Sequence, residues 1–450
     1  MGLKVVILAA GKGKRMTSKL PKVMHEIGGK PMLQHVVDAA SQMNPDDIFV
    51  VYGNGGDRLR QEMAYLDVRW VEQKEQKGTG HAVQQALPYF QRDDRVLVLY
   101  GDVPLTSVRL LKQLIQESPL NGLGLVVTEL EDPAGFGRIV RNDVGNIVAI
   151  VEHKDCKDWQ LEINEINTGI ITAPAAFLFD HLGDIDDKNS QHEFYLTDIV
   201  SIAVKDGVPV GGVMAHESQE VLGVNDRWQQ VQLERYYQSK QVKKLALMGV
   251  NIADHQRIDI RGDVVVGVDT RIDINVVLEG NVKIGDNCSI GPNVVLKDVV
   301  VGDGVEILAS SVVENATIDS HASIGPFARV RPGTVIRSGA KVGNFVEIKN
   351  TTLGENSKAS HLSYLGDATI ESRVNIGAGT ITCNYDGVKK NKTKIKDKVF
   401  IGSNSSLVAP VTINESSIVG AGSVITKSVK KKSLALTRSA QTEVRNYKRK

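Results

Sequence analysis

The chain has 450 residues, 42% of them hydrophobic and 24% charged, and a formal net charge of +1 at pH 7. This composition is typical of a folded protein with a sizeable core and excludes an intrinsically disordered one. No apolar run approaches the roughly 18 residues of a membrane span, no signal peptide is recognisable, and the three cysteines are widely separated. We therefore expect a cytoplasmic protein with no membrane partner.

Residues 1–226 alternate between strand-like and helix-like patterns. Continuous apolar runs of strand length occupy residues 4–9, 47–52, 96–100 and 124–130, and helix-like stretches include 32–43 and 80–90. Such runs are typical of parallel strands that are buried on both faces and connected by helices. The pattern predicts a layered α/β domain of right-handed βαβ units.

A different pattern follows at residues 225–248. Asn225 or Asp226 can cap a helix, apolar residues recur at helical spacing, and Gly249 provides a stop. We predict one long helix that joins two domains. The predicted limits are 1–226 for the first domain, 227–249 for the linker helix and 250–450 for the second domain.

Aliphatic residues recur every six positions after the predicted helix. The run Val266, Ile272, Leu278, Ile284, Ile290 and Leu296 is followed by restarts at Val301 and, out of phase, at Val312, and the period returns from Ile401 to Ile425. A six-residue period indicates a parallel β-helix with aliphatic side chains stacked inside. Only six of the 9 Phe, 3 Trp and 10 Tyr residues follow position 250, which fits a prism too narrow for rings.

Two basic segments accompany these repeats. Residues 388–398 contain six Lys and one Asp within the interruption 383–398, and residues 429–450 contain eight Lys or Arg and one Glu. Each is either a solvated surface segment or a binding element for an anionic ligand. A nucleic-acid partner is not expected, because the rest of the chain is acidic and no nucleic-acid-binding motif is present.

The first predicted strand runs into a glycine-rich turn at residues 8–16, and Lys22 follows in a Leu-Pro-Lys sequence. Such a turn presents backbone N–H groups to phosphates, and Lys12, Arg15 and Lys22 add three cations. The Walker pattern is absent, and the dinucleotide-binding pattern fails at Met16.

A carboxylate follows another strand, where Gly101 and Asp102 end the run 96–100. Parallel α/β sheets bind their ligands at the carboxyl ends of the strands. From its position alone, Asp102 is either a turn or helix-cap residue or a ligand-binding carboxylate, and Asn225 is a helix cap.

The repeat domain offers one candidate for acid–base chemistry, His361. Only His321 accompanies it after position 256. A lone histidine is most often structural, but an imidazole is also suited to accept a proton near neutral pH.

The glycine-rich turn with its Leu-Pro-Lys continuation resembles the sugar-1-phosphate nucleotidyltransferases. With the hexapeptide repeats, the resemblance extends over essentially the whole chain to bacterial enzymes that unite N-acetylglucosamine-1-phosphate uridylyltransferase and glucosamine-1-phosphate acetyltransferase. It implies a Rossmann-like nucleotidyltransferase domain, a left-handed parallel β-helix and a homotrimer. It also implies acetylation of glucosamine-1-phosphate by acetyl-CoA, followed by Mg²⁺-dependent uridylyl transfer from UTP to N-acetylglucosamine-1-phosphate. The product, UDP-N-acetylglucosamine, serves peptidoglycan and lipopolysaccharide synthesis.

The resemblance implies a set of residues for uridylyl transfer. Arg15 and Lys22 act on the phosphates, and Asp102 and Asn225 hold Mg²⁺. The other nucleotide contacts are Leu8, Ala9, Ala10, Gly11, Gln73, Gly78, Thr79, Tyr100 and Gly101. The sugar contacts are Gly137, Glu152 and Asn167. From the residues alone, the segment 73–80 is more simply an ordinary polar loop.

For acetyl transfer, the resemblance implies His361 as the general base that takes a proton from the acceptor amine. The implied phosphosugar contacts are Arg331, Lys349, Tyr364 and Asn375. The implied acetyl-CoA contacts are Ala378, Asn384, Tyr385, Ser403, Ala421 and Arg438. Because Asn384 and Tyr385 begin the basic loop and Arg438 lies in the basic tail, we expect both segments to attract the phosphates of CoA.

Two alternatives fit parts of the pattern. One is a sugar-1-phosphate nucleotidyltransferase whose β-helix only assembles or regulates the enzyme, and the presence of His361, Asn375 and the basic loop argues against it. The other is a binding scaffold of the kind found in translation-factor exchange subunits. The complete set of Arg15, Lys22, Asp102 and Asn225 argues against a scaffold.

Overall fold

The computed structural model describes residues 2–11, 13–53 and 56–448. The candidate cation Lys12 lies outside this part. Among the described residues, no helix combines the length and the apolar character that crossing a membrane requires.

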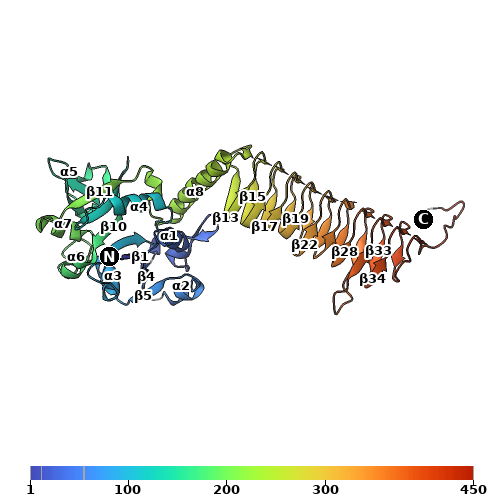
Figure 1. The fold of residues 1–450 in the computed structure, drawn as a ribbon, viewed down its shortest axis with the longest axis horizontal. Helices are drawn as coiled ribbons and strands as arrows, with labels where there is room; N and C mark the ends of the chain where they lie inside the picture. Colours follow the sequence, from blue (N-terminus) through green and yellow to red (C-terminus); the bar gives the residue numbers. More distant parts are fainter. Residues whose placement is uncertain (1, 12, 54–55, 449–450) are drawn as a thin grey trace. The chain divides into compact units, whose positions relative to one another are not determined.

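The chain forms two compact units, residues 1–237 and 238–450. The boundary between them falls inside α8 (Arg227–Leu247), the longest helix in Figure 1. A long helix therefore occupies the predicted region, whereas the limits of a separate linker at 227–249 stay a prediction.

The first unit is built on one sheet with the strand order β11-β7-β10-β6-β1-β4-β5. Every pair of neighbours is parallel except the two that involve β10. The strands are β1 (Leu3–Leu8), β4 (Asp47–Gly53), β5 (Arg69–Gln73), β6 (Arg95–Tyr100), β7 (Leu123–Glu129), β10 (Glu165–Pro174) and β11 (Val210–Met214).

The antiparallel strand β10 departs from the purely parallel sheet that we predicted. It separates β7 from β6, so the run 124–130 has no parallel partner among the other three predicted strands. The connection from β7 to β10 carries a hairpin of β8 (Arg138–Arg141) and β9 (Ile147–Val151). A parallel neighbour would require a crossover connection, usually helical, instead.

Helices cover both faces of this sheet. Val6 and Leu8 of β1 pack into a core with α3, α6 and α7, whereas Val5 and Ile7 pack into a second core with α1, α2 and α4. The alternation follows from the two-residue period of a strand, and both sets are apolar because both faces are covered. The helices are α1 (Met32–Ser41), α2 (Asp57–Glu62), α3 (Thr79–Ala86), α4 (Val108–Glu117), α5 (Asp158–Leu161), α6 (Ala175–His181) and α7 (Asp198–Lys205).

The second unit is a parallel β-helix, in which strands of successive coils pair in register (Figure 1). Ile260 pairs with Leu278 and Leu278 with Leu296, which gives coils of 18 residues, or three hexapeptides. Two later coils hold 17 residues, since Leu296 pairs with Val313 and Val313 with Val330.

Two sheets make up the faces of this β-helix. One contains β12 (Asn251–Ile252), β14 (Arg271–Ile272), β16 (Ser289–Ile290), β18 (Glu306–Ile307), β20 (Ser323–Ile324), β23 (Lys341–Asn344), β26 (Lys358–His361), β29 (Asn375–Ile376), β32 (Phe400–Ile401), β35 (Ile418–Val419) and β37 (Leu434–Ala435). The other begins with the long strands β13 (Ile258–Val266), β15 (Val276–Ile284), β17 (Val295–Val301) and β19 (Val312–Ile318), and includes β21 (Arg329–Val330), β24 (Glu347–Lys349), β27 (Tyr364–Gly366), β30 (Ile381–Cys383) and β33 (Ser406–Val408).

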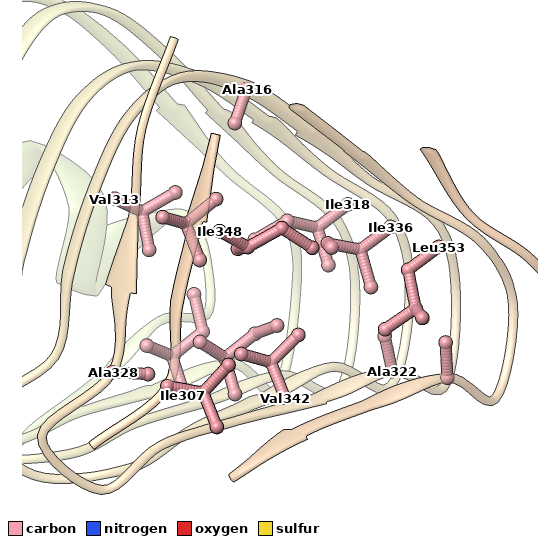
Figure 2. Packing of buried hydrophobic residues seen from close by; sticks show 14 of the residues in the cluster. Ile307, Val313, Ala316, Ile318, Ala322, Ala328, Ile336, Val342, Ile348 and Leu353 are labelled. Atoms are coloured by element: carbon pink, nitrogen blue, oxygen red, sulfur yellow. The ribbon is translucent and has the colours of Figure 1, made fainter. Parts of the chain in front are cut away.

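The aliphatic period marks the inside of the β-helix. Figure 2 shows Ile318, Ile336 and Val342 pointing into the interior, and no aromatic residue belongs to this core in the described part of the chain. The predicted restart at Val312 is wrong by one residue: Val313 is fully buried, whereas Val312 is half-buried. The 17-residue coil shortens one step between inward residues from six residues to five. A strict six-residue spacing therefore reaches Val312 instead of Val313.

Candidate active sites

A cavity of about 510 Å³ lies at the carboxyl ends of β1, β5 and β6. Ten residues implied by the family resemblance line it, namely Leu8, Ala9, Ala10, Gly11, Lys22, Gln73, Gly78, Thr79, Tyr100 and Asp102. Lys14, Gln76 and Glu193 also line it and were not predicted. The only sequence signal for Gln76 was its place in the polar loop 73–80. No sequence signal pointed to Glu193 as a site residue.

Close packing shapes the turn at the edge of the cavity. Gly13 has φ 56°, and a Cβ atom there would lie 2.8 Å from Cβ of Lys22. The Gln76 side chain donates to the Ala10 carbonyl and so ties the loop to the turn. Glycine permits both the left-handed conformation and the close approach of Lys22.

Lys22, Asp102 and Asn225 meet inside the first unit although they are far apart in sequence. The Lys22 ammonium donates to Oδ2 of Asp102 and, at 2.8 Å, to Oδ1 of Asn225. Two oxygen donors thus converge on a single cation position, which is the donor set that Mg²⁺ prefers. No cluster of three or more His, Cys, Asp or Glu side chains exists among the described residues, so further ligands would have to come from substrate and water.

The three sugar contacts implied by the resemblance also gather together. The backbone N–H of Asn167 donates to the Gly137 carbonyl at 2.9 Å. A Cβ atom on Gly137 would lie 3.4 Å from Oε1 of Glu152, whose same oxygen accepts from Thr197 at 3.2 Å. Burial raises the pKa of Glu152, and the carboxylates of Asp198 and Asp155 raise it further.

Tyr100 connects this group to the cavity. Burial raises the pKa of the Tyr100 phenol, as do the charges of Glu152 and Asp102, while Thr79 hydrogen-bonds to it. The phenol therefore stays neutral over the physiological pH range.

Six implied residues do not line the cavity, namely Arg15, Gly101, Gly137, Glu152, Asn167 and Asn225. Arg15 is exposed and makes no ion pair among the described residues. Gly101 packs behind the cavity wall, where a Cβ atom would lie 3.1 Å from Cγ1 of Val23. Gly101 therefore provides space rather than a side-chain contact.

In the β-helix, one corner carries residues of successive coils at the same register position. Backbone hydrogen bonds and strand pairing connect this column from coil to coil. Its members are Asn344, His361, Ala378, Ser403 and Ala421. Ala378, Ser403 and Ala421 are implied acetyl-CoA contacts, so the column extends from His361 along that edge.

His361 is exposed at the end of β26. Its Nδ1 lies 2.9 Å from Oδ1 of Asn344, directly opposite it on β23. Because an amide oxygen only accepts, Nδ1 donates in this contact, and in the neutral imidazole Nε2 then presents a lone pair. Asn344 was not predicted. It lies one coil of 17 residues before His361, and nothing in the sequence shows that the two residues are opposite each other.

Cations gather on the neighbouring face. Arg331 follows β21 and donates to Glu347 at 2.7 Å. Lys349 occupies the equivalent position one coil later, as the pairing of Val330 with Ile348 shows. The ammonium of Lys390 lowers the pKa of Lys349, and Arg331 lowers it further. Like charges held this close favour an anion between them.

The basic loop joins this face through Asn384. Its side-chain amide donates to Asp367 at 2.6 Å and is almost completely buried. Tyr385 beside it is 61% exposed. Tyr364 and Asn375 are half-buried on β27 and β29, and Arg438 is exposed, with Nη2 3.6 Å from where a Cβ of Gly420 would lie.

Next to His361 lies an apolar corner stripe, formed by Phe327, Phe345 and Leu362. The three side chains are 53%, 56% and 62% exposed, and the two rings stack with centroids 5.5 Å apart. All three residues have positive φ, which is rare for bulky side chains.

Family models match both halves of this arrangement. A MobA-like NTP transferase domain matches residues 5–155, a GMPPB C-terminal domain matches 260–335, and the bacterial transferase hexapeptide (six repeats) matches 392–427. Fold and sites thus define a nucleotidyltransferase domain joined to a hexapeptide-repeat transferase domain.

Full-length relatives identify the family. The bifunctional protein GlmU of Coxiella burnetii (strain CbuK_Q154) is 55% identical over 450 residues, covering 100% of this chain and 99% of the relative. GlmU of Acinetobacter baumannii (strain AYE) is 51% identical over 449 residues, with the same coverage. A solved UDP-glucose pyrophosphorylase complexed with UDP-glucose is 18% identical with a TM-score of 0.43, and covers 53% of this chain and 100% of its own. The chain belongs to the GlmU family of bifunctional enzymes, with uridylyltransferase and acetyltransferase activities.

Proposed function

We propose that the chain converts glucosamine-1-phosphate, acetyl-CoA and UTP into UDP-N-acetylglucosamine, CoA and pyrophosphate. The observation that carries this proposal is the presence of two separate constellations in one chain. Lys22 and Asp102 line a cavity in the first unit, and Lys22 donates to both Asp102 and Asn225. His361 heads a column of substrate-contact candidates in the second.

In uridylyl transfer, an oxygen of the sugar phosphate attacks the α-phosphorus of UTP, and the bond to the β-phosphate breaks to release pyrophosphate. Two anions must approach each other, so catalysis rests on positioning and charge neutralisation. Lys22 and Arg15 neutralise the phosphates, and the 8–11 turn offers its backbone to them. Gly137, Glu152 and Asn167 orient the sugar.

Asp102 and Asn225 are the residues that would hold Mg²⁺. Both present an oxygen to the position that the Lys22 ammonium takes. When bound, the ion supplies neutralisation of the phosphate charge.

In acetyl transfer, the sugar amine attacks the thioester carbonyl, the C–S bond breaks, and CoA leaves as its thiol. Nε2 of His361 accepts the amine proton and returns it to the sulfur of the departing CoA, while Asn344 holds the ring through Nδ1. Arg331, Lys349 and Lys390 hold the 1-phosphate. Ala378, Asn384, Tyr385, Ser403, Ala421 and Arg438 are the proposed acetyl-CoA contacts, with Tyr364 and Asn375 on the sugar.

We also propose a homotrimer in the cytoplasm. The apolar corner stripe beside His361 supports a second copy covering this edge, since exposed apolar side chains of this size mark interfaces. Three free cysteines suit a reducing compartment. Sedimentation equilibrium tests the assembly, and a monomer at micromolar concentration would contradict it.

Asp102→Ala and His361→Ala test the assignment of the two activities. Asp102→Ala should lower uridylyl transfer by at least about 100-fold and leave acetyl transfer intact, because it removes an oxygen donor for charge neutralisation. His361→Ala should do the reverse, with a loss of about 10²–10⁴-fold. Both activities are measured on each purified variant, and His321→Ala, an exposed histidine on the same β-helix, is the control. Equal loss of both activities in either variant would rule out two separate sites.

A further inference from the structure

Arg138 combines a large, charged side chain with almost complete burial. It begins β8, and only 1% of its surface is exposed. It makes no ion pair with a carboxylate among the described residues, and its Nε has no hydrogen-bond partner. A buried guanidinium without a counter-ion is unfavourable, because the charge loses its hydration. The residue therefore calls for an explanation beyond packing.

The guanidinium joins two segments of the first unit. Nη1 donates to the Pro133 carbonyl at 2.7 Å and to the Phe136 carbonyl, and both belong to the loop that precedes Gly137. Nη2 lies 3.4 Å from Nδ1 of His153. His153 directly follows Glu152, so one side chain spans both flanks of the proposed sugar contacts.

The loop has few other attachments. It is bounded by backbone hydrogen bonds from Leu130 to Asn164 at 3.1 Å and from Asn167 to Gly137 at 2.9 Å. Most of its residues are exposed, and it forms one wall of a second cavity of about 450 Å³. Residues 130–132 and 136 border this open space, and the guanidinium holds the loop at Pro133 and Phe136.

We propose that Arg138 is a positioning residue for the sugar half of the uridylyl-transfer site. It sets the distance between Gly137 and Glu152 by clamping the loop carbonyls to the segment 152–155. This inference rests on the proposed function, since it takes Gly137, Glu152 and Asn167 as sugar contacts. Arg138 itself lies behind the site and touches no reactant.

The test is Arg138→Met, which keeps an unbranched apolar stem and removes every donor. The KM for N-acetylglucosamine-1-phosphate should rise about tenfold, with less than a twofold change in the KM for UTP and an unchanged acetyltransferase rate. In the absence of any substrate, amide hydrogen exchange of residues 131–137 should accelerate at least about tenfold.

The matched control is Arg141→Met on the same strand, where Arg141 pairs with Glu165 and is far less buried. It should leave both KM values and the exchange of 131–137 unchanged. If Arg138→Met does not fold, Arg138→Lys is used, which keeps the charge but not the fork, and a rise of at least about threefold in the sugar KM is expected.

Equal rises in both KM values, or unchanged exchange of the loop, would overturn the proposal. The exchange result does not depend on substrate identity. A wild-type enzyme that fails to use N-acetylglucosamine-1-phosphate would instead overturn the proposed function. The amide hydrogen exchange of residues 131–137 would then still show whether Arg138 holds this loop in place.

Discussion

At the scale of single residues, Asp198 carries an unfavourable charge that pH can remove. Burial, reinforced by the carboxylates of Asp186 and Asp155, raises its pKa from 3.8 to about 6. Its place in the first turn of α7 favours the anion, but burial outweighs that interaction. Because the folded-state pKa exceeds the unfolded one, the folded protein loses stability as pH rises from about 4 to 6, and the penalty is complete above that range.

Asp198→Asn should therefore stabilise the first unit at neutral pH. We expect its unfolding midpoint to rise by about 3 °C at pH 7.5, and the difference from wild type to vanish below about pH 4. Calorimetry across this pH range measures the effect. Asp187→Asn, at an exposed position nearby, should change little at any pH. A gain that persisted unchanged at pH 4 would show that charge is not the cause.

Single residues also show how far sequence alone reaches. Asp102 and Asn225 were predicted together only through family resemblance, because they lie 122 intervening residues apart in sequence and meet only through Lys22. Asn344 and Arg138 were missed for a different reason. Their roles depend on the residues that they contact, across a coil for Asn344 and across a loop for Arg138. The type of a side chain does not indicate which residues lie opposite it in the fold.

At the scale of elements, the β-helix core should be sensitive only where the six-residue period points inward. Ile348 on β24 is fully buried, whereas Ile418 on β35 is 47% exposed. Ile348→Ala should lower the free energy of unfolding by about 2–5 kcal/mol, because the cavity left in a rigid stack cannot collapse fully. Ile418→Ala should cost less than about 0.5 kcal/mol. Denaturant titration of the two variants measures both, and equal losses would contradict the inward assignment.

The two kinds of element differ in how well sequence predicts them. The hexapeptide period repeats one local rule, so every residue that it marked is buried except Val312, where a 17-residue coil shortens one step. It does not mark the other inward positions of each coil, such as Val294 and Val305. The α/β sheet follows no repeat. Its strands β1, β4 and β6 were evident as apolar runs, but the position and direction of β10 depend on long-range pairing that a local pattern does not contain.

At the scale of the whole molecule, each unit has its own core. Buried clusters of the first unit end by Leu233, and the cluster of the second begins at Val242. Substitutions in one unit that share no partners with the other should therefore act independently. The same holds for the two proposed reactions if the phosphosugar intermediate is released between them.

Mixing two variants that each lack one activity tests that independence. Asp102→Ala should convert glucosamine-1-phosphate into N-acetylglucosamine-1-phosphate but should not uridylylate this product. His361→Ala should uridylylate N-acetylglucosamine-1-phosphate but should not form it from glucosamine-1-phosphate. Neither should form UDP-N-acetylglucosamine from glucosamine-1-phosphate, acetyl-CoA and UTP, whereas the equimolar mixture should form it after a lag. The lag reflects accumulation of the free intermediate, so added N-acetylglucosamine-1-phosphate should abolish it. Replacing either partner by the double variant should abolish product formation. If the mixture made none although both half-reactions were measurable, the intermediate would have to pass between sites without release.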